Sequence, residues 1–230
     1  MAFSECNLLE NIIFPSTLKS IGHLAFQNCD VMTEAILPEG LEYLGRHAFF
    51  NCTNLAKVNI PSTITSLSKN PFEYTAFYND KTNWTGDVLY LDNCLLDNDY
   101  ASNFEIEEDT RIFAEGALSW SRITHFDLSK FSFDIPAEFF YYCRYMESII
   151  IGKETKSIGD EAFYNCTALT KVYYTGTAEE FALITIGEGN ECFANATAYY
   201  YSEEQPTEGG NYWYYDDQGA VCIWGQEVES

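Results

Sequence analysis

The cysteines are the residues whose type and spacing most invite chemistry. The chain has eight, and five of them occupy one position of a repeat, three residues after an aromatic residue: Cys6, Cys29, Cys52, Cys143 and Cys166. Thiols at this spacing could form disulfides, bind zinc or pack in a core. Zinc is disfavoured because no C-x-x-C or C-x-x-H pair occurs. Disulfides stay within reach if neighbouring repeats stack about 4.8 Å apart, but we expect buried thiols, because free cysteine packs as a small hydrophobe.

Acidic residues and histidines offer a second possible chemistry. Glu105 and Asp127 share one position of neighbouring expected strands, where paired carboxylates would suit a glycan or peptide hydrolase. This hypothesis is disfavoured, because exposed carboxylates lack the burial that raises the pKa of a general acid. The histidines His23, His47 and His125 are not spaced as a triad or a metal pair, and no P-loop, HExxH or GxSxG phrase occurs. The sequence therefore predicts no enzyme, no catalytic residue, no cofactor and no metal.

A repeated phrase must position these residues. The pattern Ala-Phe-x-x-Cys begins at residues 2, 25, 48 and 162, so that the first three copies are 23 residues apart. Each repeat, which we call a rung, continues with Leu-x-x-Ile-x-Ile-Pro and with Ile-Gly before the next Ala-Phe. A period of about 20–29 residues with this many apolar anchors is typical of a leucine-rich-repeat solenoid. Such solenoids are usually binding surfaces.

Within a rung, the pattern predicts one short strand and one tight turn. The Leu-x-x-Ile-x-Ile segment alternates inward and outward positions, as a strand does. Proline ends this strand because it has no N–H to donate, and the rung glycines Gly22, Gly45 and Gly159 are expected to provide a turn with positive φ. The expected fold is a β-rich solenoid. It is a right-handed stack of rungs of about 23 residues with short parallel strands and little long helix.

The period is interrupted twice. Residues 1–74 and 102–175 carry regular rungs, whereas residues 75–101 predict a β-hairpin island that protrudes from the stack. Residues 176–230 are expected to form a C-terminal cap, in which an aromatic hairpin over 211–224 seals the open end of the core. We expect one continuous solenoid domain. Because residue 1 falls inside a rung, we also expect the chain to be a piece of a longer protein.

Composition and charge exclude several kinds of partner. The chain has 35 acidic and 12 basic residues, a net charge of −23, which repels nucleic acid and anionic membrane surfaces. Its 47% hydrophobic residues are enough to form a core, so the chain is not disordered. No stretch approaches the roughly 18 apolar residues of a membrane span, and the first residues lack the features of a signal peptide. We expect no nucleic-acid partner and no direct membrane insertion.

Outward positions on the successive strands define the predicted binding surface. They are Ile13, Ile36, Asn59, Glu105, Asp127, Ile150 and Tyr173. Four of the seven are apolar or aromatic where water is expected, and the two acidic residues lie at the centre. Plain β-propensity would also favour Ile and Tyr on a strand. Exposed apolar patches with aromatic anchors are, however, typical of protein-binding sites. These seven residues are the candidate concave protein-binding face.

The full rung phrase resembles the BspA-like leucine-rich-repeat family, the Treponema pallidum type of repeat. The best matches run over 14–29 and 151–166, and regular rungs cover about two thirds of the chain. Pro71 in place of Ala and Thr75 in place of Cys depart from the pattern where the expected island begins. The resemblance implies a bacterial cell-surface or secreted protein of the adhesion type. It therefore implies an extracellular location and a partner protein from a host or a neighbouring cell.

Together these inferences predict a non-enzymatic module that binds protein, or mediates adhesion, through the concave strand face. The alternative is a rigid structural spacer that presents other modules of a larger surface protein. No residue pattern indicates the identity of the ligand or the oligomeric state.

Overall fold

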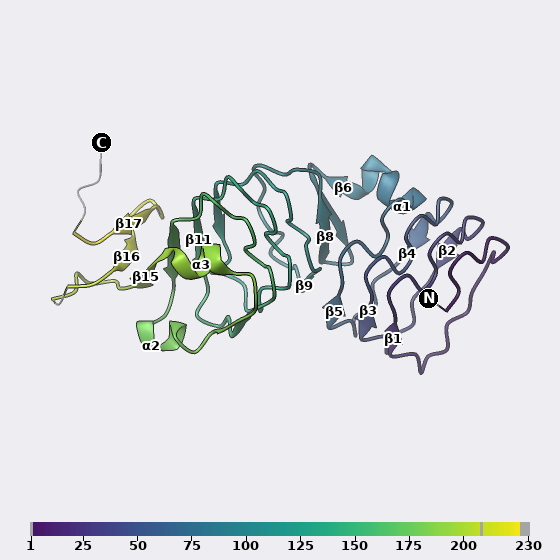
Figure 1. Cartoon of the computed structure of the whole chain (residues 1–230), viewed down its shortest axis with the longest axis horizontal. Helices are drawn as coiled ribbons and strands as arrows, with labels where there is room; N and C mark the ends of the chain where they lie inside the picture. Colours follow the sequence, from purple (N-terminus) through teal and green to yellow (C-terminus); the bar gives the residue numbers. More distant parts are fainter. Residues whose placement is uncertain (1, 208, 226–230) are drawn as a thin grey trace. The chain divides into compact units, whose positions relative to one another are not determined.

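The computed structural model describes residues 2–207 and 209–225, and the chain divides into two compact units. Unit 1 comprises residues 1–121 and 138–140, and unit 2 comprises residues 122–137 and 141–230. Both units are built from the same rung, with short and mostly parallel strands, and helices are few and short (Figure 1). The predicted fold class is therefore confirmed. No helix in the described part of the chain is long and apolar enough to cross a membrane.

Unit 1 stacks its first rungs through two columns of two-residue parallel strands. One column is β1 (Ser20–Ile21), β3 (Tyr43–Leu44) and β5 (Ser66–Leu67), and the other is β2 (Glu34–Ala35) and β4 (Lys57–Val58). Ser20 pairs with Tyr43 and Tyr43 with Ser66, which keeps the spacing of 23 residues. The β2–β4 column is the strand that the Ile-x-Ile pattern predicted. The β1–β3–β5 column lies just before the rung glycine, where the sequence had predicted a turn.

The rung glycines permit close backbone contact rather than a left-handed turn. None of the three has a positive φ, so that expectation is wrong. A Cβ added to Gly45 would lie 2.6 Å from the carbonyl carbon of Gly22 in the preceding rung. Left-handed residues instead flank the rung phenylalanine, as His47 (φ 55°) and Asn51 (φ 56°) flank Phe49. The chain therefore turns at a corner formed by the residue two positions before the rung phenylalanine and the residue two positions after it.

Rings and thiols stack at this corner in unit 1. Phe3, Phe26, Phe49 and Phe72 form a continuous stack with centroid separations of 5.2, 5.0 and 5.7 Å. The thiol of Cys52 donates a hydrogen bond to the carbonyl oxygen of Phe26 at 2.9 Å. Burial raises the pKa of Cys52 to about 12. All eight cysteines are free thiols in the structure, and the Cys52 thiol is a packing group rather than a nucleophile.

The hairpin of unit 1 is integrated into the stack. This segment comprises α1 (Ala76–Asn79), the 3-10 helix η1 (Lys81–Asn83), β6 (Trp84–Thr85), β7 (Val88–Leu91), β8 (Cys94–Asn98) and β9 (Ile112–Phe113). The predicted hairpin around residues 92–93 is present, and β8 also pairs in parallel with β9. Leu95 on β8 is fully buried, so the expectation of a protruding island is wrong. Thr75, which replaces the rung cysteine, accepts a hydrogen bond from the Tyr78 N–H and so caps α1.

Unit 2 contains the longer sheet. Its order is β10 (His125–Asp127), β11 (Ser148–Ile151), β13 (Lys171–Tyr174), β15 (Thr197–Tyr201), β16 (Tyr212–Tyr215) and β17 (Val221–Ile223). The pairs are parallel except for β16–β17, which forms the predicted hairpin. The second column is β12 (Ser157–Ile158) and β14 (Thr185–Ile186), and the helices are α2 (Ala178–Phe181) and α3 (Glu191–Asn195).

At the end of the rungs, α3 takes the place of the next repeat. Phe193 stacks on Phe163 at 4.9 Å, as the phenylalanine of a further rung would. The Oδ1 atom of Asn190 accepts a hydrogen bond from the Phe163 N–H, and its Nδ2 donates to the Gly159 carbonyl, both at 2.9 Å. The core is therefore closed here by α3, which the sequence had not predicted. Residues 226–230 of the expected cap lie outside the described residues.

Candidate functional site

Three of the predicted outward residues meet on one face of the unit 2 sheet. Asp127 of β10 aligns with Ile150 of β11, and Ile150 aligns with Tyr173 of β13. Tyr199 on β15 extends the row. The parallel register brings these residues together because each strand begins at the same position of its rung. This row is the central feature of the candidate site.

Two residues of the row are covered by the C-terminal hairpin. Ile150 is 8% exposed and Tyr173 is 6% exposed, so their predicted exposure to water is wrong. Trp213 on β16, itself fully buried, packs on Tyr173 with a centroid distance of 5.5 Å. Its Nε1–H donates to the Tyr174 carbonyl at 3.0 Å. The hairpin therefore buries its aromatic residues on the outward sheet face, where they add about 1 kcal/mol per ring pair beyond area burial.

A groove remains beside this covered cluster. A hollow of about 360 Å³ is lined by ten residues, which we call the unit 2 groove: His125, Phe126, Asp127, Glu147, Ser148, Ile150, Thr170, Lys171, Tyr173 and Val221. Its floor is a second row of outward residues, in which His125 aligns with Ser148 and Ser148 with Lys171. The imidazole Nδ1 of His125 lies 2.9 Å from the Ser148 hydroxyl. One side of the groove is thus polar and the other apolar.

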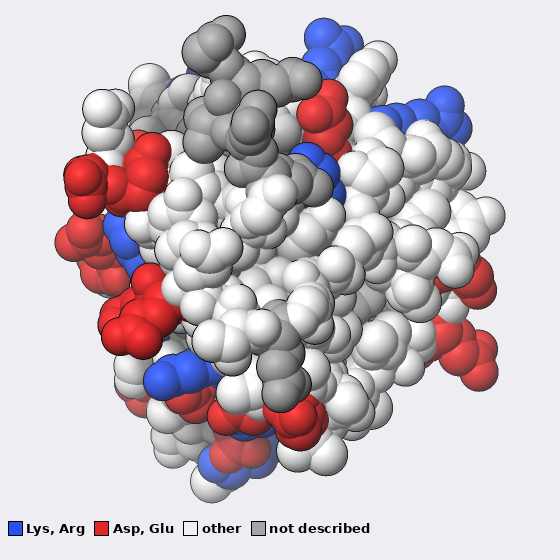
Figure 2. All heavy atoms as spheres, turned by 90° about the vertical axis from the view of Figure 1, so that its left-hand side faces the viewer, with Lys and Arg blue, Asp and Glu red and all other residues white. Residues whose placement is uncertain are grey.

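Charge in the groove is mixed, with exposed side chains of both signs. Asp127, Glu147 and Lys171 are exposed. The Asp127 carboxylate accepts a hydrogen bond from the Ser129 N–H at 2.7 Å, which holds it at the rim. Figure 2 looks onto unit 2 from the side of its C-terminal strands and shows charged side chains around an uncharged centre. The arrangement suits recognition of a partner with both apolar and charged groups.

The other four predicted residues belong to unit 1, and the structure does not place them on one strand column. Ile13 is 95% exposed and outside any strand, and Ile36 is exposed just after β2. Asn59 uses its side chain on the backbone: its Oδ1 accepts from the Leu37 N–H at 2.7 Å and its Nδ2 donates to the Leu37 carbonyl at 3.1 Å. Glu105 is exposed and outside any strand.

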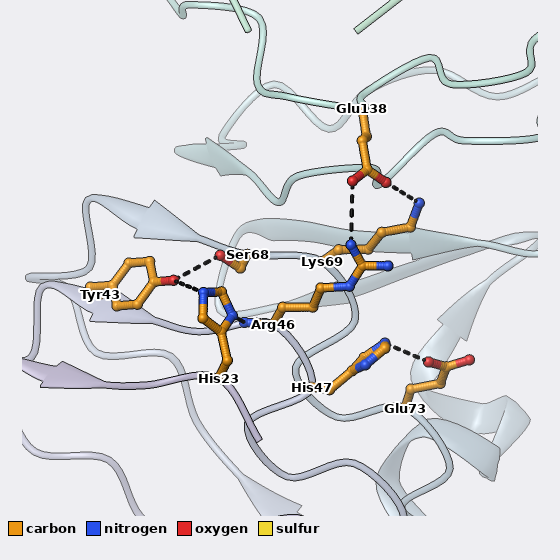
Figure 3. A network of polar contacts seen from close by, with 8 residues as sticks. All are labelled: His23, Tyr43, Arg46, His47, Ser68, Lys69, Glu73 and Glu138. Atoms are coloured by element: carbon orange, nitrogen blue, oxygen red, sulfur yellow. Dashed lines mark hydrogen bonds and ion pairs between the residues drawn. The ribbon is translucent and has the colours of Figure 1, made fainter. Parts of the chain in front are cut away.

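The histidines of unit 1 lie in a structural network (Figure 3). The His47 Nε2 lies 3.1 Å from a Glu73 oxygen, and burial lowers the pKa of His47 in spite of this carboxylate. His23 accepts the Arg46 backbone N–H at 3.0 Å. The Arg46 guanidinium donates a hydrogen bond to one carboxylate oxygen of Glu138 at 3.3 Å. Among residues 2–207 and 209–225, no three His, Cys, Asp or Glu side chains are placed to hold a metal ion.

The residues that sequence reasoning missed come from the cap. Val221 lines the unit 2 groove and Trp213 is buried against Ile150 and Tyr173, although the aromatic hairpin had been expected to close the core. The alternation of side chains along a strand was the signal that could have revealed them. When the strand pairing is extended to β15 and β16, Tyr199, Tyr201 and Trp213 fall on the same face as the outward row. From the sequence alone these residues cannot be assigned to a face, because the strand that pairs with β16 is not known.

Comparison with protein families identifies the repeat. A family described as "BspA type Leucine rich repeat region" matches six copies, over residues 1–99 and 76–199. No curated protein matches the chain.

Three of the solved structures that the chain resembles are leucine-rich repeat proteins of bacteria. A leucine-rich repeat protein from Bacteroides ovatus is 22% identical over 90% of this chain, with a TM-score of 0.39. This chain spans 60% of that protein. A leucine rich cell surface protein from Faecalibacterium prausnitzii is 19% identical over 71% of this chain and 65% of its own length, with a TM-score of 0.29. A T. pallidum leucine rich repeat protein is 15% identical, over 80% of this chain and 67% of its own, with a TM-score of 0.28.

Proposed function

Since this chain belongs to the BspA-type leucine-rich repeat family, we propose that it is a non-enzymatic protein-binding module of a bacterial surface or secreted protein. Repeat proteins of this kind commonly present extended binding surfaces. The similar structure from Faecalibacterium prausnitzii is described as that of a cell surface protein, which supports the proposed location.

The unit 2 groove is the proposed binding surface. The observation that carries this proposal is the alignment of Asp127, Ile150 and Tyr173 beside a hollow with one polar and one apolar side. Ile150 and Tyr173 are held rigidly under the hairpin, so a partner would not have to order them, which lowers the entropic cost of binding. The partner proposed is an extended protein segment that carries basic side chains, because the chain has a net charge of −23.

A peptide selection tests this proposal while the natural partner is unidentified. The whole chain is immobilised, and a displayed library of random peptides is selected against it. Selected peptides are then measured by calorimetry on the wild type and on Asp127→Lys, which reverses one charge at the rim of the groove. We expect basic peptides whose affinity falls about tenfold or more in this variant, a loss of about 1.4 kcal/mol.

Glu154→Lys is the matched control. Glu154 is also an exposed acidic residue of unit 2, but it does not line the groove. The same change of charge there is expected to leave the affinity within about twofold. Equal losses in the two variants would mean that the charge of the whole chain, and not the groove, attracts the peptides. A selection that yields no binder would favour the alternative of a rigid spacer.

A further inference from the structure

A second hollow lies wholly within unit 1. Its volume is about 390 Å³. The end of the third rung supplies Lys69, Asn70 and Glu73, α1 supplies Tyr78, and the end of β8 supplies Asp97. Further lining comes from residues 98–100 and 119–120. We call this site the unit 1 hollow. It brings separate segments of the chain together around one concave surface.

Two large aromatic rings are exposed at this hollow. Tyr100 is 58% exposed and Trp120 is 47% exposed. Both residues have positive φ, 54° and 64°, a conformation that bulky side chains adopt at an energetic cost. The corner position that Trp120 occupies carries asparagine in three other rungs, at Asn28, Asn51 and Asn165, and tyrosine in two, at Tyr74 and Tyr142. Asparagine tolerates this conformation well. A tryptophan at this corner is costly for the backbone and leaves much of its ring accessible to a ligand.

Charged groups in the wall are paired within the protein. The Lys69 ammonium lies 2.8 Å from Glu138, and the Lys81 ammonium lies 3.0 Å from Asp99. Glu73 lies 3.1 Å from His47, as described above. Because the Lys69 and Lys81 ammonium groups each have a carboxylate partner, the hollow does not require an anionic ligand. The same carboxylates keep free lone pairs that can accept hydrogen bonds from hydroxyl groups.

Two polar side chains of the wall are buried, and one of them has an oxygen without a hydrogen-bond donor. Asp97 is 6% exposed and accepts hydrogen bonds from the Tyr78 hydroxyl at 2.7 Å and from the Asn98 N–H at 2.8 Å. The Oδ1 atom of Asn70 is buried and accepts no hydrogen bond from the protein. A buried acceptor of this kind calls for an explanation, such as strain, a functional role or a bound water. Asp97 and Asn70 line the same hollow as Tyr100 and Trp120.

From this arrangement we propose that the unit 1 hollow binds a neutral carbohydrate. The C–H face of a sugar ring is apolar and packs on aromatic rings such as Tyr100 and Trp120. Its hydroxyl groups are donors that match the carboxylate and amide oxygens of the wall. An anionic ligand is disfavoured because Glu73, Asp97 and Asp99 would repel it. The described residues contain no cluster of three acidic, cysteine or histidine side chains for a metal ion.

Calorimetric titration of the whole chain with neutral oligosaccharides tests this proposal. The probes are cellotriose, maltotriose, chitotriose and lactose, which differ in linkage and in ring substituents. We expect at least one probe to bind. Tyr100→Ala and Trp120→Ala should each weaken that binding by about tenfold, the effect expected from loss of one stacking ring.

Tyr145→Ala is the control, because Tyr145 is a similarly exposed tyrosine that lies in unit 2. It should leave sugar affinity unchanged, and thermal unfolding followed by circular dichroism should confirm that each variant remains folded. Asp99→Asn, which keeps the shape of the side chain, provides a second variant if either ring variant unfolds; it should also weaken binding. The proposal is overturned if no probe binds, or if the ring variants bind as well as the wild type.

Discussion

Gly22 and Gly45 occupy the same position of consecutive rungs, but their surroundings differ. A Cβ on Gly45 would approach Gly22 to 2.6 Å, whereas a Cβ on Gly22 would have no atom within 4 Å. We expect Gly45→Ala to lower the free energy of unfolding by about 1–3 kcal/mol through overpacking. Gly22→Ala should be neutral or slightly stabilising, since neither glycine has a positive φ. Urea denaturation of the two variants measures this difference, and equal effects would contradict the close-contact explanation.

Asp97 is the residue whose protonation should respond most to pH. Burial raises its pKa to about 6 from an ordinary value of 3.8, with Glu73 adding to the rise and Tyr78, Asn98 and Lys69 opposing it. A raised pKa means that the native state binds the proton more tightly than the unfolded state. The contribution of Asp97 to stability is therefore fully present below pH 3.8 and is lost as pH rises through about 6, a difference of about 3 kcal/mol.

Carbon-13 NMR of the side-chain carboxyls tests this prediction directly. The Asp97 resonance should titrate with a midpoint near pH 6. A midpoint close to the ordinary value of 3.8 would show that the carboxyl is better hydrated than its burial indicates.

At the scale of elements, the C-terminal hairpin acts as a cover for the sheet of unit 2. Tyr173 is buried against Trp213, so Tyr173→Lys should lower the free energy of unfolding by about 3 kcal/mol or more. Ile13→Lys places the same side chain at an exposed position and should change stability by less than about 0.5 kcal/mol. Thermal and urea unfolding distinguish the two, and a well-folded Tyr173→Lys variant would contradict the packing described here. Loss of binding in a Tyr173 variant is therefore no evidence of a direct contact with a partner.

Asn190 connects the last regular rung to α3. Its amide accepts the Phe163 N–H and donates to the carbonyls of Gly159 and Gly187. Asn190→Ala should destabilise unit 2 by about 2–4 kcal/mol, because it leaves buried backbone groups without partners. Asn195→Ala, at an exposed position of the same short helix, is the control and should have little effect. Similar unfolding curves for the two variants would rule out the proposed role of the Asn190 hydrogen bonds in stability.

Elements with a local signal could be predicted from the sequence, and elements that depend on distant pairing could not. The Ile-x-Ile strands and the hairpin turn around residues 92–93 were predicted because alternation and turn residues mark them. The strand column of β1, β3 and β5 was missed because these two-residue strands do not lie within an alternating segment such as the Ile-x-Ile segment of β2 and β4. The hairpin was expected to protrude because its partner strand, β9, begins 14 residues after Asn98.

For the candidate site, the sequence predicted which residues form the row but did not predict whether their side chains are exposed to solvent. Asp127, Ile150 and Tyr173 do align, because the period of 23 residues is unbroken there. Glu105 is not part of the row, because it lies outside any strand in the segment between β8 and β9. The exposure of the row depends on Trp213, which lies 40 residues beyond Tyr173 and packs on it only through the fold of the cap.

At the scale of the whole molecule, charge should govern association with the proposed partner. A net charge of −23 favours encounter with basic segments, and this attraction weakens as salt shortens the Debye length from about 10 Å at 0.1 M to about 3 Å at 1 M. The association rate of a selected basic peptide should therefore fall steeply with added salt, whereas its dissociation rate should change little. Stopped-flow measurements at several salt concentrations would detect this pattern.

The most direct test of the proposed function is to map the bound peptide by NMR. Amide and side-chain shifts of the whole chain would be followed while a peptide from the selection is added. We expect the largest changes in β10, β11 and β13, at the residues of the unit 2 groove. Changes confined to unit 1, or spread evenly over acidic side chains, would contradict the assignment of protein binding to this groove.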